Sequence, residues 1–127
     1  MMQHITVNLK VDNVKDTLTF YKDVLGFEVL MTVPDEDQPI LNWAMVKNGG
    51  AQLMFQEKEN LEEEYPMLKQ ESGTGCLTLF VKVDDLENLF AKITGKSEVI
   101  KPIHTTFYGA KEFAIVDNNG YVLTFAE

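Results

Sequence analysis

The stretch LKVDNV, at Leu9–Val14, is repeated almost unchanged as VKVDDL, at Val81–Leu86. In both copies an alternating apolar and polar run, which is typical of a strand, ends at side chains able to cap a helix. Val11 and Val83 lie 72 positions apart, and the stretches NGGAQLMFQ and NNGYVLTFA recur 70 positions apart. Because two separate anchors agree on the repeat length, we predict one structural module written twice.

Each module is predicted to have the order β-α-β-β-β. In the first, strands are expected over Ile5–Val11, Phe27–Val33, Leu41–Lys47 and Ala51–Gln56, with a helix over Val14–Phe27 that Gly26 stops. In the second, strands are expected over Cys76–Val83, Glu98–Thr105, Lys111–Val116 and Tyr121–Ala126, with a helix over Leu86–Ile93 that ends near Gly95.

The length of the chain limits how these modules are organised. With 127 residues, 45% of them hydrophobic, the chain suits one domain with one core. We therefore expect residues 1–127 to form a single domain, with modules over 1–57 and 75–127. The polar, acidic segment 58–74 is expected to be a surface linker with one short helix; calcium binding by its Glu run is the less favoured alternative.

Charge and cysteine content narrow the setting of the protein. The formal charge of -9 argues against nucleic acid as a partner, because such surfaces gather Lys and Arg. It favours solubility, and it is compatible with a cationic ligand. The single Cys76 cannot form an internal disulfide, the N-terminal residues lack a signal-peptide pattern, and no apolar run is long enough to span a membrane. These features predict a soluble, cytoplasmic protein.

The alternation within the strands predicts two chemically different sheet faces. Ile5, Val7, Leu9 and Val11 share an apolar face that a helix should cover, as do Leu77, Leu79, Val81 and Val83 in the second module. The opposite faces are mixed, rich in Thr, Asn, Gln, Met and Phe. Two modules that pair their mixed sheets edge to edge would curl these faces into a shared concavity, which is a common place for a ligand.

Three stretches together resemble a known family. They are VDNVKDTLTFYKDVLGFEV, VKVDDL and FYGAKEFAIVDNNGYVLTF, in this order and spacing. They are similar to the vicinal oxygen chelate superfamily, which includes glyoxalase I, extradiol dioxygenases, fosfomycin-modifying enzymes and bleomycin resistance proteins. The resemblance covers essentially the whole chain. It implies an α+β fold of two β-α-β-β-β modules that form a cup-shaped, partly open barrel, commonly in a homodimer.

The resemblance also implies where a catalytic metal would lie. Metal-dependent members place a ligand, mostly His or Glu, on the first and the last strand of each module. The matching positions here hold Thr6, Met54, Thr78 and Thr124. Neutral hydroxyls and a thioether are poor donors for zinc and its relatives, so we expect no metal and no other cofactor. These residues are expected to line the cup instead, and we assign no catalytic residue.

Other side chains with reactive or aromatic groups are weighed in the same way. His4 and His104 are expected to be exposed or to have a structural role. Cys76 has no evident base beside it in the sequence pattern, so we expect it to be a small core or cavity residue. Phe55 and Phe113 are expected in the core. The rings of Trp43, Phe107 and Tyr108 are candidates for stacking on a planar ligand. The full set of expected ligand-binding residues is Thr6, Asn8, Trp43, Met54, Gln56, Thr78, Phe80, Phe107, Tyr108 and Thr124.

The favoured function is therefore that of a small-molecule binding protein that sequesters a planar or cationic compound, as the resemblance to bleomycin resistance proteins implies. One alternative is a metal-dependent lyase or dioxygenase of the same superfamily with displaced ligands. Another is a non-catalytic regulatory or structural dimer. The sequence leaves open whether the cup forms within one chain or across a homodimer.

Overall fold

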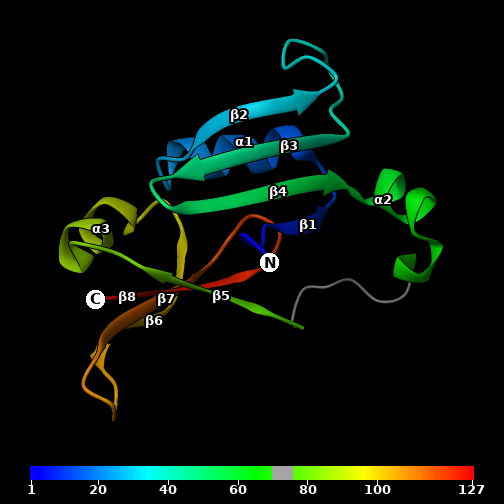
Figure 1. The fold of residues 1–127 in the computed structure, drawn as a ribbon. Helices are drawn as coiled ribbons and strands as arrows, with labels where there is room; N and C mark the ends of the chain where they lie inside the picture. The colour runs from blue at the N-terminus through cyan, green and yellow to red at the C-terminus, as the bar shows by residue number, and fades with distance from the viewer. Residues whose placement is uncertain (70–75) are drawn as a thin grey trace. The chain divides into compact units, whose positions relative to one another are not determined.

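The computed structural model of the chain describes residues 1–69 and 76–127. It divides into two compact units, Met1–Gly73 and Thr74–Glu127. Each unit carries one mixed four-stranded sheet, and the two sheets have the same strand topology (Figure 1). The predicted repeat and the α+β class are thus confirmed. In both described parts of the chain, no helix combines the length and apolar character needed to cross a membrane.

Unit 1 builds its sheet in the order β1-β4-β3-β2. The first and last strands of the module, β1 and β4, are parallel neighbours, and the other pairs are antiparallel. The elements are β1 (Val7–Val11), α1 (Val14–Asp23), β2 (Glu28–Val33), β3 (Trp43–Asn48), β4 (Ala51–Glu57), α2 (Lys58–Glu64) and a 3-10 helix, η1 (Pro66–Lys69).

Local sequence explains where α1 begins and ends. The side chain of Asn13 accepts a hydrogen bond of 2.9 Å from the amide of Asp16, which caps the first turn. Gly26 adopts a positive φ of 72°, and the amide of Phe27 then reaches back to the carbonyl of Tyr21 at 2.9 Å. The helix itself stops at Asp23, short of the predicted end, because this reversal needs several non-helical residues.

The buried side of α1 and the covered face of the sheet form the core of unit 1. The ring of Tyr21 lies 4.7 Å from that of Phe55, and both side chains are fully buried. Leu9 and Val11 are buried beside them, as the alternation predicts. Ile5 was expected on this face, but it precedes β1 and is 88% exposed, so that expectation is wrong.

Unit 2 repeats this arrangement with the sheet order β5-β8-β7-β6. Its elements are β5 (Thr78–Lys82), α3 (Leu86–Ile93), β6 (Glu98–Thr105), β7 (Lys111–Val116) and β8 (Val122–Ala126). Asp85 caps α3 by accepting from the amide of Asn88 at 3.1 Å. In the core, Phe113 of β7 packs between Phe90 of α3, at 5.0 Å, and Phe125 of β8, at 5.1 Å.

Two sequence predictions about this region need correction. Leu79 and Val81 are only half-buried, and Leu77 is exposed, so the apolar face of β5 is covered less completely than expected. The predicted linker contains two helical segments, α2 and η1, where one was expected. The rest of that linker, residues 70–74, and residue 75 at the start of the second module lie outside the described residues.

The packing of Phe113 leads to a test of the unit 2 core. Phe113→Ala should lower the free energy of unfolding by about 3–5 kcal/mol, because it removes a fully buried ring and leaves a cavity. Urea denaturation followed by circular dichroism would measure this. Phe107→Ala is the matched control; Phe107 is 100% exposed, so the change should stay within about 0.5 kcal/mol. Equal effects of the two substitutions would contradict the assignment of the core.

Candidate functional site

The mixed face of unit 1 is assembled by strand register. Asn8 of β1 lies opposite Met54 of β4, and Met54 lies opposite Met45 of β3. In the neighbouring row, Gln56 of β4 lies between Lys10 of β1 and Trp43 of β3. The structure therefore brings four predicted site residues, Asn8, Trp43, Met54 and Gln56, onto one face of one sheet.

Gln56 is the centre of a polar network on this face. Its side-chain oxygen accepts from Asn8 at 2.9 Å, and its amide nitrogen donates to Asn60 at 2.8 Å and to Glu64 at 3.1 Å. Gln56 is buried, and buried polar groups are stable when they are hydrogen-bonded in this way. Its amide is thus engaged at both ends by the protein, which orients the exposed Asn8 beside Met54.

Lys10 and Glu62 join the same face to α2. The Lys10 ammonium lies 2.9 Å from a Glu62 carboxylate oxygen and donates to the carbonyl of Leu68 at 2.7 Å. The hydrogen bond from Lys10, with the nearby positive charges, lowers the pKa of Glu62 against the opposing effect of desolvation. The acidic helix α2 is therefore held against the sheet, where the sequence predicted a solvated linker.

The mixed face of unit 2 follows the same register rule. Phe80 of β5 lies opposite Thr124 of β8, and Thr124 lies opposite Ala114 of β7. Thr78 pairs with Val122 at the end of the sheet. Phe80 is 58% exposed, as is expected of a ring that faces away from α3. Three predicted site residues, Thr78, Phe80 and Thr124, thus share this face.

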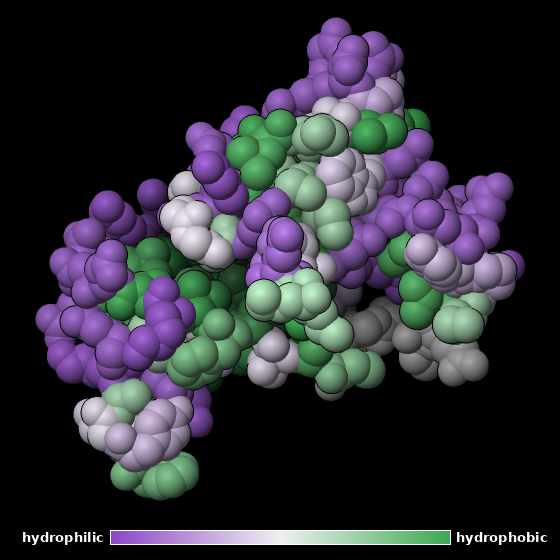
Figure 2. Space-filling model, in the orientation of Figure 1, coloured by the Kyte–Doolittle hydropathy of each residue, from purple (hydrophilic) through white to green (hydrophobic). Residues whose placement is uncertain are grey.

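The remaining predicted aromatics lie in the turn between β6 and β7. Phe107 is fully exposed, and its ring meets that of Tyr108 edge-on at 5.0 Å. Figure 2 shows hydrophobic atoms at the tip of this projecting hairpin. The Tyr108 hydroxyl donates to the carboxylate of Glu112, and this bond raises the pKa of Tyr108. Tyr108 is therefore attached to the mixed face of unit 2, whereas Phe107 points into solvent.

The positions that match the family's metal ligands hold threonine and methionine side chains in both units. Thr6 precedes β1 and is half-buried; Met54 and Thr124 lie on the mixed faces of their units. Within residues 1–69 and 76–127, no three His, Cys, Asp or Glu side chains gather where they could hold a metal ion. His4 and Cys76 are exposed, and His104 Nδ1 lies 2.8 Å from the carbonyl of Pro102. The expectation that Cys76 is a core or cavity residue is thus wrong.

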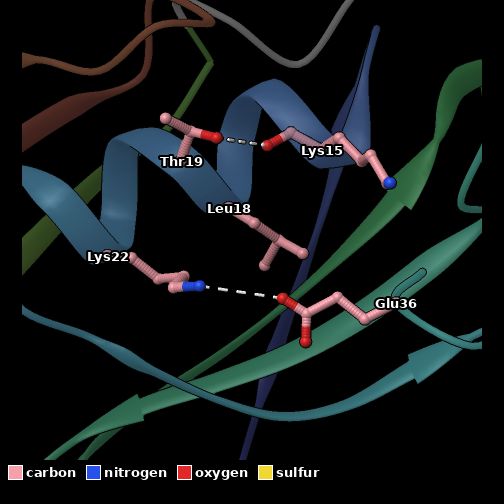
Figure 3. Close-up of a pocket in the computed structure, with 5 residues that line it drawn as sticks. All are labelled: Lys15, Leu18, Thr19, Lys22 and Glu36. Carbon is pink, nitrogen blue, oxygen red and sulfur yellow. Dashed lines mark hydrogen bonds and ion pairs between the residues drawn. The ribbon is translucent and has the colours of Figure 1, made fainter. Parts of the chain in front are cut away.

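A hollow on the helix side of unit 1 lies apart from the predicted residues. It is lined by Lys15, Leu18, Thr19 and Lys22 of α1 and by Glu36 of the loop after β2, and Figure 3 shows the Lys22 side chain directed toward Glu36. Lys22 and Glu36 lie 3.7 Å apart, and both side chains are about half-exposed. Such a solvent-screened pair contributes little to stability. None of the predicted site residues lines this hollow.

Sequence reasoning missed two features of the mixed faces. One is the set of side chains that α2 supplies in unit 1, namely Asn60, Glu62 and Glu64. The other is Glu112 in unit 2, a buried acid that shares its face with Ala114 and Thr124. The alternation of KEFAIV, in which Phe113 and Ile115 are apolar, already indicates that Glu112 faces away from the core.

The chain matches a family model over residues 2–125; the model is described as Glyoxalase/Bleomycin resistance protein/Dioxygenase superfamily. No curated protein sequence matches the chain.

Solved structures share the fold at low sequence identity. TioX from Micromonospora sp. ML1 superposes with a TM-score of 0.80 and 20% identity, covering 99% of this chain and 98% of that one. A protein of unknown function from Agrobacterium tumefaciens str. C58 gives 0.80 and 22%, with 100% and 94% covered. A glyoxalase/bleomycin resistance protein/dioxygenase from Nocardioides gives 0.78 and 16%, with 99% and 83% covered. Identities this low show the fold alone.

The Lys10–Glu62 pair predicts how stability responds to acid. Because the pKa of Glu62 is lowered in the folded protein, its stabilising effect is present above the usual carboxyl value of 4.5 and is lost as the pH falls through the lowered pKa. Glu62→Gln should therefore lower the melting temperature at neutral pH and flatten its decline below that value. Thermal melts across this pH range would measure both effects.

The exposed neighbour Glu63 provides the control, because Glu63→Gln makes the same change of net charge. Its melting curve should decline with acid as steeply as that of the wild type. If the Glu62→Gln and wild-type curves ran parallel, the pair would not contribute to acid sensitivity.

Proposed function

The chain belongs to the Glyoxalase/Bleomycin resistance protein/Dioxygenase superfamily, and from that premise we propose that it binds and sequesters a small molecule without a catalytic metal. One observation carries the proposal. The positions at which metal-dependent members would place their ligands hold Thr6, Met54, Thr78 and Thr124, while the faces around them keep aromatic and polar side chains.

The donor chemistry of these positions does not fit a catalytic metal. A divalent cation in such a site takes imidazole, thiolate or carboxylate, and a zinc ion is bound by Cys, His, Asp or Glu. Threonine hydroxyls stay neutral near pH 7, and the thioether of Met54 is a soft, weak donor. We therefore derive no reaction step from a metal, and we assign these side chains to contact with a ligand.

The proposed ligand contacts lie on the mixed face of each module, and each face is considered by itself. Trp43 on the face of unit 1 and Phe80 on the face of unit 2 would each supply flat apolar contact to a planar compound, because aromatic rings give a large contact area with few rotatable bonds. Asn8 on the first face and Thr124 on the second would supply hydrogen bonds that orient such a compound. This division between apolar walls and a few polar groups is usual for small-molecule sites.

The expected assembly and compartment belong to the same proposal. We propose a homodimer, which the apolar residues exposed along β2, Leu30, Met31 and Val33, would support by offering surface for a second copy. A cytoplasmic setting agrees with the presence of a single cysteine, Cys76, in the sequence, since proteins of reducing compartments do not depend on disulfides. Light scattering on the purified protein would measure the oligomeric state.

A thermal-shift titration tests the proposed function directly. Purified protein is titrated with metal-free bleomycin and with a panel of planar cationic compounds, with and without added zinc, manganese or nickel. A ligand at a hundredfold its dissociation constant should stabilise the folded protein by about 2.7 kcal/mol. Saturable stabilisation without metal supports the binding function. Stabilisation only by metal would favour the lyase or dioxygenase alternative, and no stabilisation would favour the structural dimer.

The only tryptophan of the chain, Trp43, gives a local readout of the same event. Because Trp43 lies half-buried on the mixed face of unit 1, a stacked ligand should quench its fluorescence or shift its emission. Trp43→Phe should abolish the signal while calorimetry still detects binding, with affinity reduced about tenfold or less. If the emission spectrum stayed unchanged at saturating ligand, Trp43 would not be part of the binding site.

A further inference from the structure

A buried carboxylate on the mixed face of unit 2 has no ion-pair partner in the part of the chain that the structure describes. Glu112 of β7 is only 7% exposed, although its neighbours Phe113 and Ile115 take the core side of the same strand. Burying a charged group is costly unless it is paired, so buried acids in proteins usually face a cation. Whether the Glu112 carboxylate could bind a cationic group therefore depends on which side chains already contact it.

Within the described residues, Glu112 has a hydrogen-bond donor but no ion-pair partner. The Tyr108 hydroxyl donates to one carboxylate oxygen, and the carboxylate in turn raises the pKa of Tyr108, because ionising the phenol would place two anions together. The adjacent Lys111 points to the other side of the sheet, where its ammonium lies 3.1 Å from Glu87. Among residues 1–69 and 76–127, no Lys, Arg or His nitrogen lies within 4.0 Å of the Glu112 carboxylate.

The strands on either side of Glu112 place small and long side chains beside it on the same face of the sheet. Its register partners are Ala126 on β8 and His104 on β6, and Lys82 lies beyond Ala126 on β5. The neighbouring row runs from Ala114 through Thr124 to Phe80. Small side chains, two of them buried alanines, thus separate Glu112 from the exposed ring of Phe80. The backbones of Glu112 and Phe80 are separated by two strand spacings, on the order of 10 Å.

This arrangement suits a ligand that has a cationic group at one end and a flat apolar group at the other. A protonated amine would supply the missing charge at the Glu112 carboxylate, through a charge-assisted hydrogen bond that is stronger than a neutral one. The flat portion would lie over Thr124 and contact the exposed ring of Phe80. A neutral hydroxyl at the same place would satisfy a hydrogen bond but would leave the buried charge unbalanced.

We propose that Glu112 is the anionic anchor of the binding site and that the ligand class is a primary or secondary ammonium compound with a planar apolar body. The assignment rests on the proposed binding function and specifies its ligand. Tyr108 positions the anchor, because its hydroxyl holds one carboxylate oxygen and leaves the other for the ligand. The same hydrogen bond keeps the Phe107–Tyr108 turn against the edge of this face.

The test compares two probes that differ only in charge, naphthylmethylamine, which is protonated at neutral pH, and naphthylmethanol, which is neutral. Isothermal titration calorimetry measures both against the wild-type protein. The amine should bind about ten- to a hundredfold more tightly, as expected for a hydrogen bond to a charged group in a buried site. This comparison needs no variant, so it stands even if a substitution at Glu112 impairs folding.

Glu112→Gln then locates the charge, because the amide keeps an acceptor for Tyr108 while it removes the anion. Affinity for the amine should fall to that of the alcohol, and affinity for the alcohol should stay within about twofold. Glu98→Gln is the matched control, since Glu98 is an exposed acid at the other end of the same sheet, opposite Val116. It changes the net charge equally and should leave both affinities unaltered.

The outcomes separate this assignment from the function on which it rests. Binding of both probes with equal affinity, or an unchanged preference for the amine in Glu112→Gln, would overturn the anchor while the binding function stood. A loss of amine affinity in Glu98→Gln as large as that in Glu112→Gln would overturn it also, because the effect would then come from net charge. If neither probe bound the wild-type protein, the proposed site itself would be overturned.

Discussion

Burial of one face of each sheet is the constraint on which the rest of this structure depends. In unit 1 the face is closed by the contact of Tyr21 with Phe55, and in unit 2 by that of Phe90 with Phe113. Each such side chain contributes about 1.5–3 kcal/mol when it leaves water. Because successive residues of a strand point to opposite sides, each buried ring sends its neighbours to the other face. The mixed faces are therefore as strictly determined as the cores.

The two units use one topology for different chemistry. In unit 1, the acidic helix α2 returns to the sheet, and its side chains engage Gln56 and Lys10. That face is polar but internally satisfied. In unit 2 the charge on Glu112 is met only by the Tyr108 hydroxyl among the described groups. The repeated topology thus supplies the same scaffold twice, and the side chains on the mixed faces give each unit its own chemistry.

The candidate site could be predicted from sequence only in part. The alternation of side chains along each strand predicted Asn8, Met54, Phe80 and Thr124 on the mixed faces, and the strand register confirms this. Phe55 and Phe113 were predicted in the cores, and both side chains are fully buried. The same rule places Glu112 on the mixed face of β7, but it does not show that this acid is buried. The alternation could not show that the Gln56 side-chain amide donates hydrogen bonds to Asn60 and Glu64, since these bonds depend on where α2 packs.

The sequence by itself determined the repeat, the order of elements within each module and which residues of each strand share a face. It also limited the helix caps to Asp12 or Asn13 and to Asp84 or Asp85. These are local properties, set by hydrogen bonds and side-chain directions over a few residues. Tertiary structure alone decided that Ile5 stays in solvent, that α2 folds onto the sheet and that Glu112 is buried with Tyr108 as its partner. Each of these depends on contacts between segments distant in the chain or across a turn, which no local pattern specifies.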